Sequence, residues 1–84
     1  MFYTTENMSN ERSIKMLKEL YHEYDKFKLD YNGEICDIKV NDIFDNMIKF
    51  QFIMNGKLSP ENLCIDNDKI VKIRVMHDTI TIYI

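Results

Sequence analysis

Apolar and polar residues alternate along most of the chain beyond residue 26, with the period of two that is typical of β-strands. Two Asn-Gly steps, Asn32-Gly33 and Asn55-Gly56, interrupt this alternation. Asn-Gly is the preferred sequence of a type I′ turn, because both central residues of that turn need positive φ. The pattern therefore predicts two tight β-hairpins centred on these steps.

An earlier segment has the period of a helix instead. Apolar residues that begin at Ile14 recur three or four positions apart, and Ser9 or Asn10 is a suitable N-cap. We expect one amphipathic helix over residues 10–25, which must cover an apolar surface. We expect a loose N-terminal arm over residues 1–9.

Strand phase predicts which side chains share a face. Across the first Asn-Gly turn, Leu29 falls opposite Cys36 and Phe27 falls opposite Ile38, so all four are expected to face the core. The next alternating run, which begins near Met47, carries a second set of core residues on one side. This set is Ile48, Phe50, Phe52 and Met54.

The last part of the chain predicts a third hairpin, with strands near residues 69–76 and 79–84 joined at His77-Asp78. Pairing across this turn brings apolar residues together three times. The pairs are Val75 with Ile80, Ile73 with Ile82, and Val71 with Ile84.

Between these hairpins, Pro60 cannot donate to a strand ladder and follows a possible cap, Ser59. The sequence therefore predicts a single helical turn here, followed by residues 63–65 as a plug for one end of the core. Cys36 and Cys64, the two cysteines, are expected to be reduced and buried.

Together these elements predict an α+β fold: an N-terminal amphipathic helix, then an antiparallel meander of five or six strands over residues 26–84. The meander can be a curled sheet or a small barrel, and the sequence leaves both open. A chain of 84 residues has room for one core, so we expect one domain over residues 1–84.

The formal net charge of −3 argues against binding nucleic acid through bulk electrostatics, and no direct DNA binding is expected. No apolar run approaches the roughly 20 residues that span a bilayer, and no secretory leader is recognisable. We therefore expect a cytoplasmic protein that does not contact membranes. It is expected to be a monomer or a homodimer.

Catalytic chemistry has little support in the sequence. His77-Asp78 could form half of an acid–base pair, and Cys36 or Cys64 could be a nucleophile, but a polar turn and buried thiols explain these residues better. Asp66-Asn67-Asp68 resembles the start of a calcium loop but lacks its glycine and its final glutamate. We expect no enzymatic activity, catalytic residue, metal or cofactor.

Carboxylates gather in the predicted loops and on the strand faces turned away from the core. Such residues can form a negative surface for a basic partner such as the nucleic-acid groove of another protein. The expected partner-binding residues are Asp30, Glu34, Asp37, Asp42, Asp45, Asp66 and Asp68.

A smaller basic face is predicted on the last hairpin, where cations could contact phosphate while a tyrosine stacks on a base. The residues of this alternative RNA-binding face are Lys69, Lys72, Arg74 and Tyr83.

The N-terminal helix, the curled antiparallel sheet and the order of Asn32-Gly33 before Phe44-Asp45-Asn46 resemble the bacterial Sm-like RNA chaperones. That resemblance, over roughly residues 10–75, implies a ring-forming RNA binder. The chain departs from the family pattern because it lacks a glycine in the second strand and joins its last strands by a tight hairpin. No binding residue is carried over from the family.

Two functions from different classes follow. The first is a small non-enzymatic protein-binding module, an inhibitor from a phage or mobile element. It would use its acidic surface to block a host nuclease or another defence enzyme, as anti-CRISPR proteins do. Abundant Ile, Lys and Asn indicate an AT-rich genome and fit such a source. The alternative is an Sm-like small-barrel RNA-binding protein.

Overall fold

The computed structural model describes residues 2–4 and 10–84, and it confirms the α+β class with one α-helix ahead of a curled, mostly antiparallel sheet. The elements in chain order are β1 (Phe2–Thr4), α1 (Asn10–Leu20), β2 (Lys26–Tyr31), β3 (Glu34–Ile43), β4 (Met47–Met54), β5 (Lys57–Leu58), β6 (Leu63–Asp66), the 3₁₀ turn η1 (Asn67–Lys69), β7 (Lys72–Met76) and β8 (Thr79–Tyr83).

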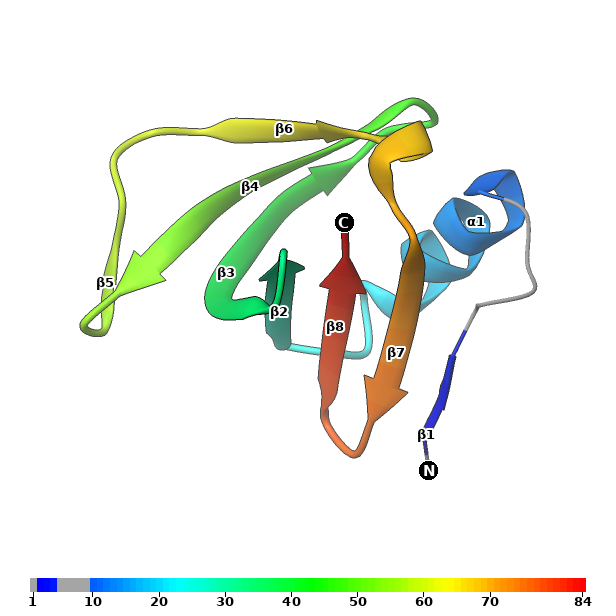
Figure 1. Cartoon of the computed structure of the whole chain (residues 1–84), viewed down its shortest axis with the longest axis horizontal. Helices are drawn as coiled ribbons and strands as arrows, with labels where there is room; N and C mark the ends of the chain where they lie inside the picture. The colour runs from blue at the N-terminus through cyan, green and yellow to red at the C-terminus, as the bar shows by residue number, and fades with distance from the viewer. Residues whose placement is uncertain (1, 5–9) are drawn as a thin grey trace.

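The described strands form one sheet in the order β1-β7-β8-β2-β3-β4-β5, and β6 pairs with β4 beside β5 (Figure 1). β1 ends one side of the sheet, while β5 and β6 end the other, so the sheet does not close on itself. Of the two architectures that the sequence left open, the curled sheet is therefore the one observed.

One pairing departs from a simple meander. β8 lies between β7 and β2 and runs parallel to β2, with Ile80 opposite Phe27 and Ile82 opposite Leu29. All four side chains are at most 5% exposed. Burial of apolar surface on both neighbours explains why the last strand returns to the first hairpin.

The predicted loose arm needs a correction at its start. Residues Phe2–Thr4 form β1, which pairs with β7 antiparallel and places Tyr3 opposite Val75. Residues 1 and 5–9, the rest of the predicted arm, lie outside the described residues.

Both Asn-Gly turns are confirmed as tight hairpin turns. The φ angles are 52° and 54° for the two asparagines and 89° and 77° for the two glycines, as a type I′ turn requires. The expected pairs Leu29–Cys36 and Phe27–Ile38 are present in the first hairpin.

The third hairpin is confirmed in register but is shorter than expected. Ile73 pairs with Ile82 and Val75 with Ile80, and all four are 0% exposed. Val71 lies before the start of β7 and is 69% exposed, so its expected place in the core is wrong. Strand phase predicts which face of the sheet a side chain lies on, but it does not predict where along the strand the core ends.

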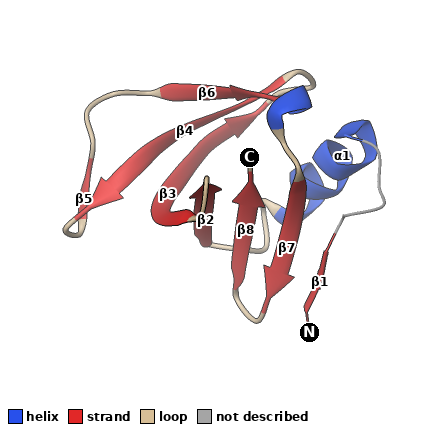
Figure 2. Cartoon of the chain, viewed as in Figure 1, coloured by secondary structure: helices blue, strands red, loops and turns tan. Residues whose placement is uncertain are grey.

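The helix ends at Leu20 and continues as a turn rather than reaching residue 25. Ile14 and Leu17 are buried in the core cluster, as the helical period predicts. The Tyr21 hydroxyl lies within hydrogen-bond distance of the carbonyl oxygens of Val40 and Asn41, at 3.1 and 3.0 Å, and donates to them. These two residues lie at the bulge of β3. This contact joins the end of the helix to the bulge of β3. Figure 2 shows α1 in blue among the red strands of the sheet.

The segment after Pro60 also differs from expectation. It forms no helical turn, and residues 63–66 form β6 along the edge of β4 instead. Of the expected plug, only Ile65 is buried; Leu63 is half-buried and Cys64 is exposed. Cys36 is half-buried, so both cysteines are more accessible than expected.

Candidate functional site

The seven acidic residues expected to bind a partner fall into two groups. Asp30, Glu34 and Asp37 lie on the β2–β3 hairpin. The second group lies at the β3–β4 turn and the β6–η1 corner. Its members are Asp42, Asp45, Asp66 and Asp68, all of them exposed.

In the hairpin group, two carboxylates already have partners. Asp30 Oδ1 accepts a 2.9 Å hydrogen bond from the Gly33 amide and so stabilises the turn. Asp37 forms an ion pair with Lys28 at 3.5 Å. Glu34 is exposed and lies opposite Tyr31, which makes it the carboxylate of this group that best fits an intermolecular contact.

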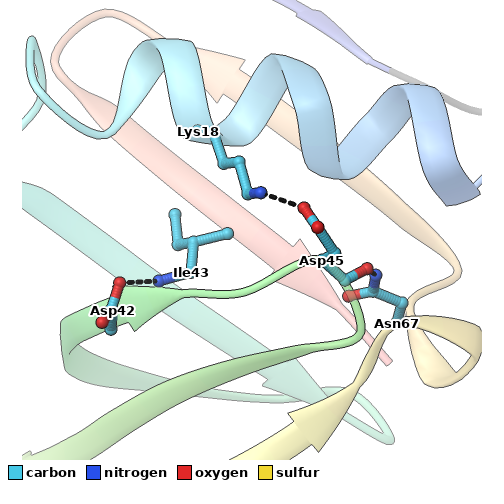
Figure 3. Close-up of polar contacts among 5 residues, drawn as sticks. All are labelled: Lys18, Asp42, Ile43, Asp45 and Asn67. Atoms are coloured by element: carbon cyan, nitrogen blue, oxygen red, sulfur yellow. Dashed lines mark hydrogen bonds and ion pairs between the residues drawn. The ribbon is translucent and has the colours of Figure 1, made fainter.

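The β3–β4 turn is held firmly in place (Figure 3). Lys18 of α1 forms an ion pair with Asp45, and Asn67 donates its side-chain amide to the Asp45 carbonyl. The Asn67 backbone amide donates to the Asn46 carbonyl at 3.0 Å, and Asp42 Oδ1 accepts from the Ile43 amide at 2.8 Å. The two Asn67 bonds join the β3–β4 turn to the β6–η1 corner, so the two parts of the second acidic group lie together.

Lys18 also lowers the pKa of Asp45. Its hydrogen bond, and then its charge, hold the pKa of Asp45 below the ordinary value of 3.8. A lowered folded-state pKa contributes stability above the unfolded pKa, and this contribution is lost as pH falls through the folded pKa. Because the Asp45 side chain is fully exposed, the effect on global stability is small.

We expect Lys18→Met to raise the pKa of Asp45 back toward 3.8, as measured by NMR titration of the side-chain carboxyl carbon. The small stability difference between wild type and variant should be present above about pH 4 and disappear in more acidic solution. Lys15→Met, one turn earlier on the helix, is the control and should leave the pKa of Asp45 unchanged. Equal pKa values in wild type and Lys18→Met would refute this ion pair.

A groove contains one of the seven expected acidic residues, Asp66, together with the cation Lys69. It has a volume of about 300 Å³ and lies between the ends of β2 and β8 on one side and β6 with η1 on the other. Its lining residues are Tyr31, Cys64, Ile65, Asp66, Lys69 and Ile84. We call these six residues the β6 groove. Figure 1 shows the C-terminal end of β8 facing the part of the chain that contains β6.

Tyr31, Ile65 and Ile84 form the apolar part of the β6 groove. Tyr31 is 57% exposed, whereas Ile35, which is 59% exposed, lies on the opposite face of the β2–β3 hairpin. The register places Ile35 opposite Asp30, next to Tyr83 of β8. Exposed aromatic and apolar side chains bordered by charged residues, here Asp66 and Lys69, have the composition of a protein interface.

Sequence reasoning missed Tyr31 and Ile84 as site residues. Both have the phase of core residues, and both lie at strand ends, where the structure leaves them partly uncovered. A tyrosine beside the first Asn-Gly turn was the available signal, because turn-flanking aromatics can extend past the sheet.

The alternative basic face is only partly assembled. Lys72, Arg74 and Tyr83 share one face of the β7–β8 hairpin, and Lys72 Nζ lies 4.7 Å from the Tyr83 ring centroid. Lys69 lies in η1 and lines the β6 groove instead. The parallel β2–β8 pairing adds Lys28 beside Thr81, but Lys28 is paired with Asp37.

The residues considered for catalysis are not brought together. His77 is exposed in the last turn with φ 54°, and the partners of Asp78 are Lys26 at 3.2 Å and Thr79 at 3.1 Å. The Lys26 and Thr79 hydrogen bonds lower the pKa of Asp78. Within residues 2–4 and 10–84, no three His, Cys, Asp or Glu side chains group as metal ligands.

A wider hollow of about 630 Å³ lies between the end of α1 and the β4–β5 hairpin. Aromatic and aliphatic side chains such as Tyr21, Tyr24 and Leu58 line it, with Asp25 and Lys39 as opposite charges. None of the seven expected acidic residues lines this hollow, so its chemistry differs from that of the β6 groove.

Comparison of the chain with protein-family models, with curated proteins and with solved structures gives no match. In the described part of the chain, no helix is long and apolar enough to cross a membrane.

Proposed function

We propose that this protein is a small non-enzymatic binding module that inhibits a nucleic-acid enzyme of a bacterial host. In this proposal it comes from a phage or mobile element and acts in the host cytoplasm against a nuclease or another defence enzyme, as anti-CRISPR proteins do. The observation that carries the proposal is the β6 groove. There an exposed tyrosine and the C-terminal isoleucine lie beside Asp66, with Glu34 on the adjoining hairpin.

Charge complementarity supports the choice of partner. Enzymes that act on nucleic acids carry basic grooves that neutralise phosphates. Asp66 and Glu34 are exposed, and within the described part of the chain neither forms an ion pair like those of Asp37 and Asp45, so both carboxylates are accessible to a cationic surface. A net charge of −3 adds long-range attraction toward such a surface.

Apolar anchors support the choice of site. Interface energy is concentrated in a few aromatic or arginine side chains that become fully desolvated on binding. A tyrosine has few side-chain torsions, so little conformational entropy is lost when Tyr31 is covered.

The test is capture of host proteins from a low-GC bacterial lysate on the immobilised protein, before and after nuclease treatment. We expect one nucleic-acid enzyme to be retained after nuclease treatment and its activity to fall when purified protein is added. The double variant Glu34→Lys/Asp66→Lys should lose this retention. Glu19→Lys/Glu61→Lys carries the same charge change on exposed residues outside the groove and should keep it.

Recovery that depends on RNA would contradict the proposal and support the alternative RNA-binding protein. Equal retention by the two double variants would remove the β6 groove as the binding surface.

A further inference from the structure

The free edge of β6 faces the same groove as Tyr31, and its backbone is positioned to take part in binding. Among the described strands, β6 pairs with β4 alone. An edge strand has backbone groups with no partner strand on one side, and these groups can accept an additional strand.

The phase of the β4–β6 ladder identifies these groups. The 3.0 Å bond from the Asn67 amide to the Asn46 carbonyl makes these two residues a hydrogen-bonded pair. Bonded and non-bonded pairs alternate in an antiparallel ladder, so the next pair, Met47 with Asp66, is non-bonded. The same alternation makes the pair formed by Cys64 non-bonded. The backbone N–H groups of Cys64 and Asp66 therefore point away from β4.

Cys64 and Asp66 both line the β6 groove. Ile65 between them lines it too, although successive side chains of a strand point to opposite faces. Three consecutive lining residues place β6 along one wall of the groove. Tyr31 and Ile84 form the opposite wall and supply apolar contacts for a side chain of the bound segment.

We propose that the β6 groove binds an extended basic segment of the partner as an additional strand along β6; this inference rests on the proposed function. The segment forms backbone hydrogen bonds with Cys64 and Asp66. It places an apolar side chain against Tyr31 and Ile84, and a lysine or arginine near the Asp66 carboxylate. The groove volume of about 300 Å³ is at the small end for a ligand pocket and suits single side chains of such a segment.

The probe is a short acetylated and amidated peptide in which Lys and Val alternate. NMR titration of the full-length protein should show the largest shifts at the Cys64 and Asp66 amides. A peptide with Glu in place of Lys should bind at least tenfold more weakly. A Lys/Val peptide that is N-methylated on alternate residues should not bind detectably, because the edge bonds need its N–H groups.

Cys64→Pro removes one outward N–H of β6 and leaves the Ile65 bonds to β4 intact, since proline is tolerated where the N–H faces away from the ladder. We expect it to weaken binding of the Lys/Val peptide about fivefold to tenfold. Cys64→Ser keeps the N–H, so it should weaken binding less than Cys64→Pro does. If Cys64→Pro does not fold, the N-methylated peptide against wild-type protein tests the same bonds.

Equal binding of the N-methylated and unmodified peptides would overturn strand addition while leaving the proposed function intact. Strand addition by a partner would also be overturned if the Lys/Val peptide did not bind and the protein formed a concentration-dependent dimer that Cys64→Pro abolished. In that case a second copy of the chain would occupy the edge of β6. Loss of enzyme capture combined with intact peptide binding would count against the proposed function alone.

Discussion

Truncating Ile80 to alanine is expected to lower the free energy of unfolding by about 3 kcal/mol. Ile80 is 0% exposed and lies on β8, where it faces Val75 of β7 and Phe27 of β2. Alanine leaves a cavity between the antiparallel and the parallel neighbour, and neither strand can move to fill it without breaking a ladder. A domain of this size has about 4–13 kcal/mol of total stability, so the loss is a large fraction of it.

Thermal denaturation followed by circular dichroism should show a midpoint about 10–20 °C below that of the wild type. Thr81→Ala is the matched control, because Thr81 is adjacent on the same strand and lies half-buried on the opposite face. It should change stability by less than about 1 kcal/mol. Similar losses for the two variants would mean that β8 is not packed between β7 and β2 as the structure shows.

Tyr31→Ala is expected to weaken the complex with the captured host enzyme about thirtyfold, or about 2 kcal/mol. Tyr31 is 57% exposed in the free protein, and covering its ring on binding removes apolar surface from water at one wall of the groove. The dissociation constant, measured by isothermal titration calorimetry, tests the expectation. The unfolding midpoint should hardly change, since exposed side chains contribute little to folding stability.

Met54→Ala is the control for Tyr31→Ala. Met54 is 68% exposed, also apolar, and lies at the end of β4 next to the β4–β5 turn, which projects away from the helix end of the molecule (Figure 1). It should leave binding within about twofold of wild type. A larger loss for Met54→Ala than for Tyr31→Ala would place the interface on the β4–β5 hairpin and contradict the β6 groove.

Local signals in the sequence predicted several elements correctly. The Asn-Gly turns and the pairs Leu29–Cys36 and Val75–Ile80 follow from turn chemistry and alternation, which act over a few neighbouring residues. The buried stripe of α1 follows from the helical period in the same way.

The candidate site was only partly predictable. Asp66 and Glu34 were identified from charge alone, and both lie at or beside the β6 groove. Tyr31 was not identified, because alternation assigns it the face of a core residue and exposure at a strand end depends on what packs above it. The exposure of Cys64 was missed because an edge strand was mistaken for a core plug.

The hairpins, their registers and the buried faces of β2, β3, β7 and β8 could be predicted from the sequence, because these depend on φ preferences and on the period of apolar residues. The neighbours of three strands could not be predicted from these local signals: β8 lies parallel to β2, β1 extends the sheet beside β7, and β6 ends it as an open edge. Alternation states which side of a strand is apolar but is silent on which distant strand lies beside it. That choice comes from the combined burial of side chains far apart in the chain, and it also creates the groove beside Tyr31.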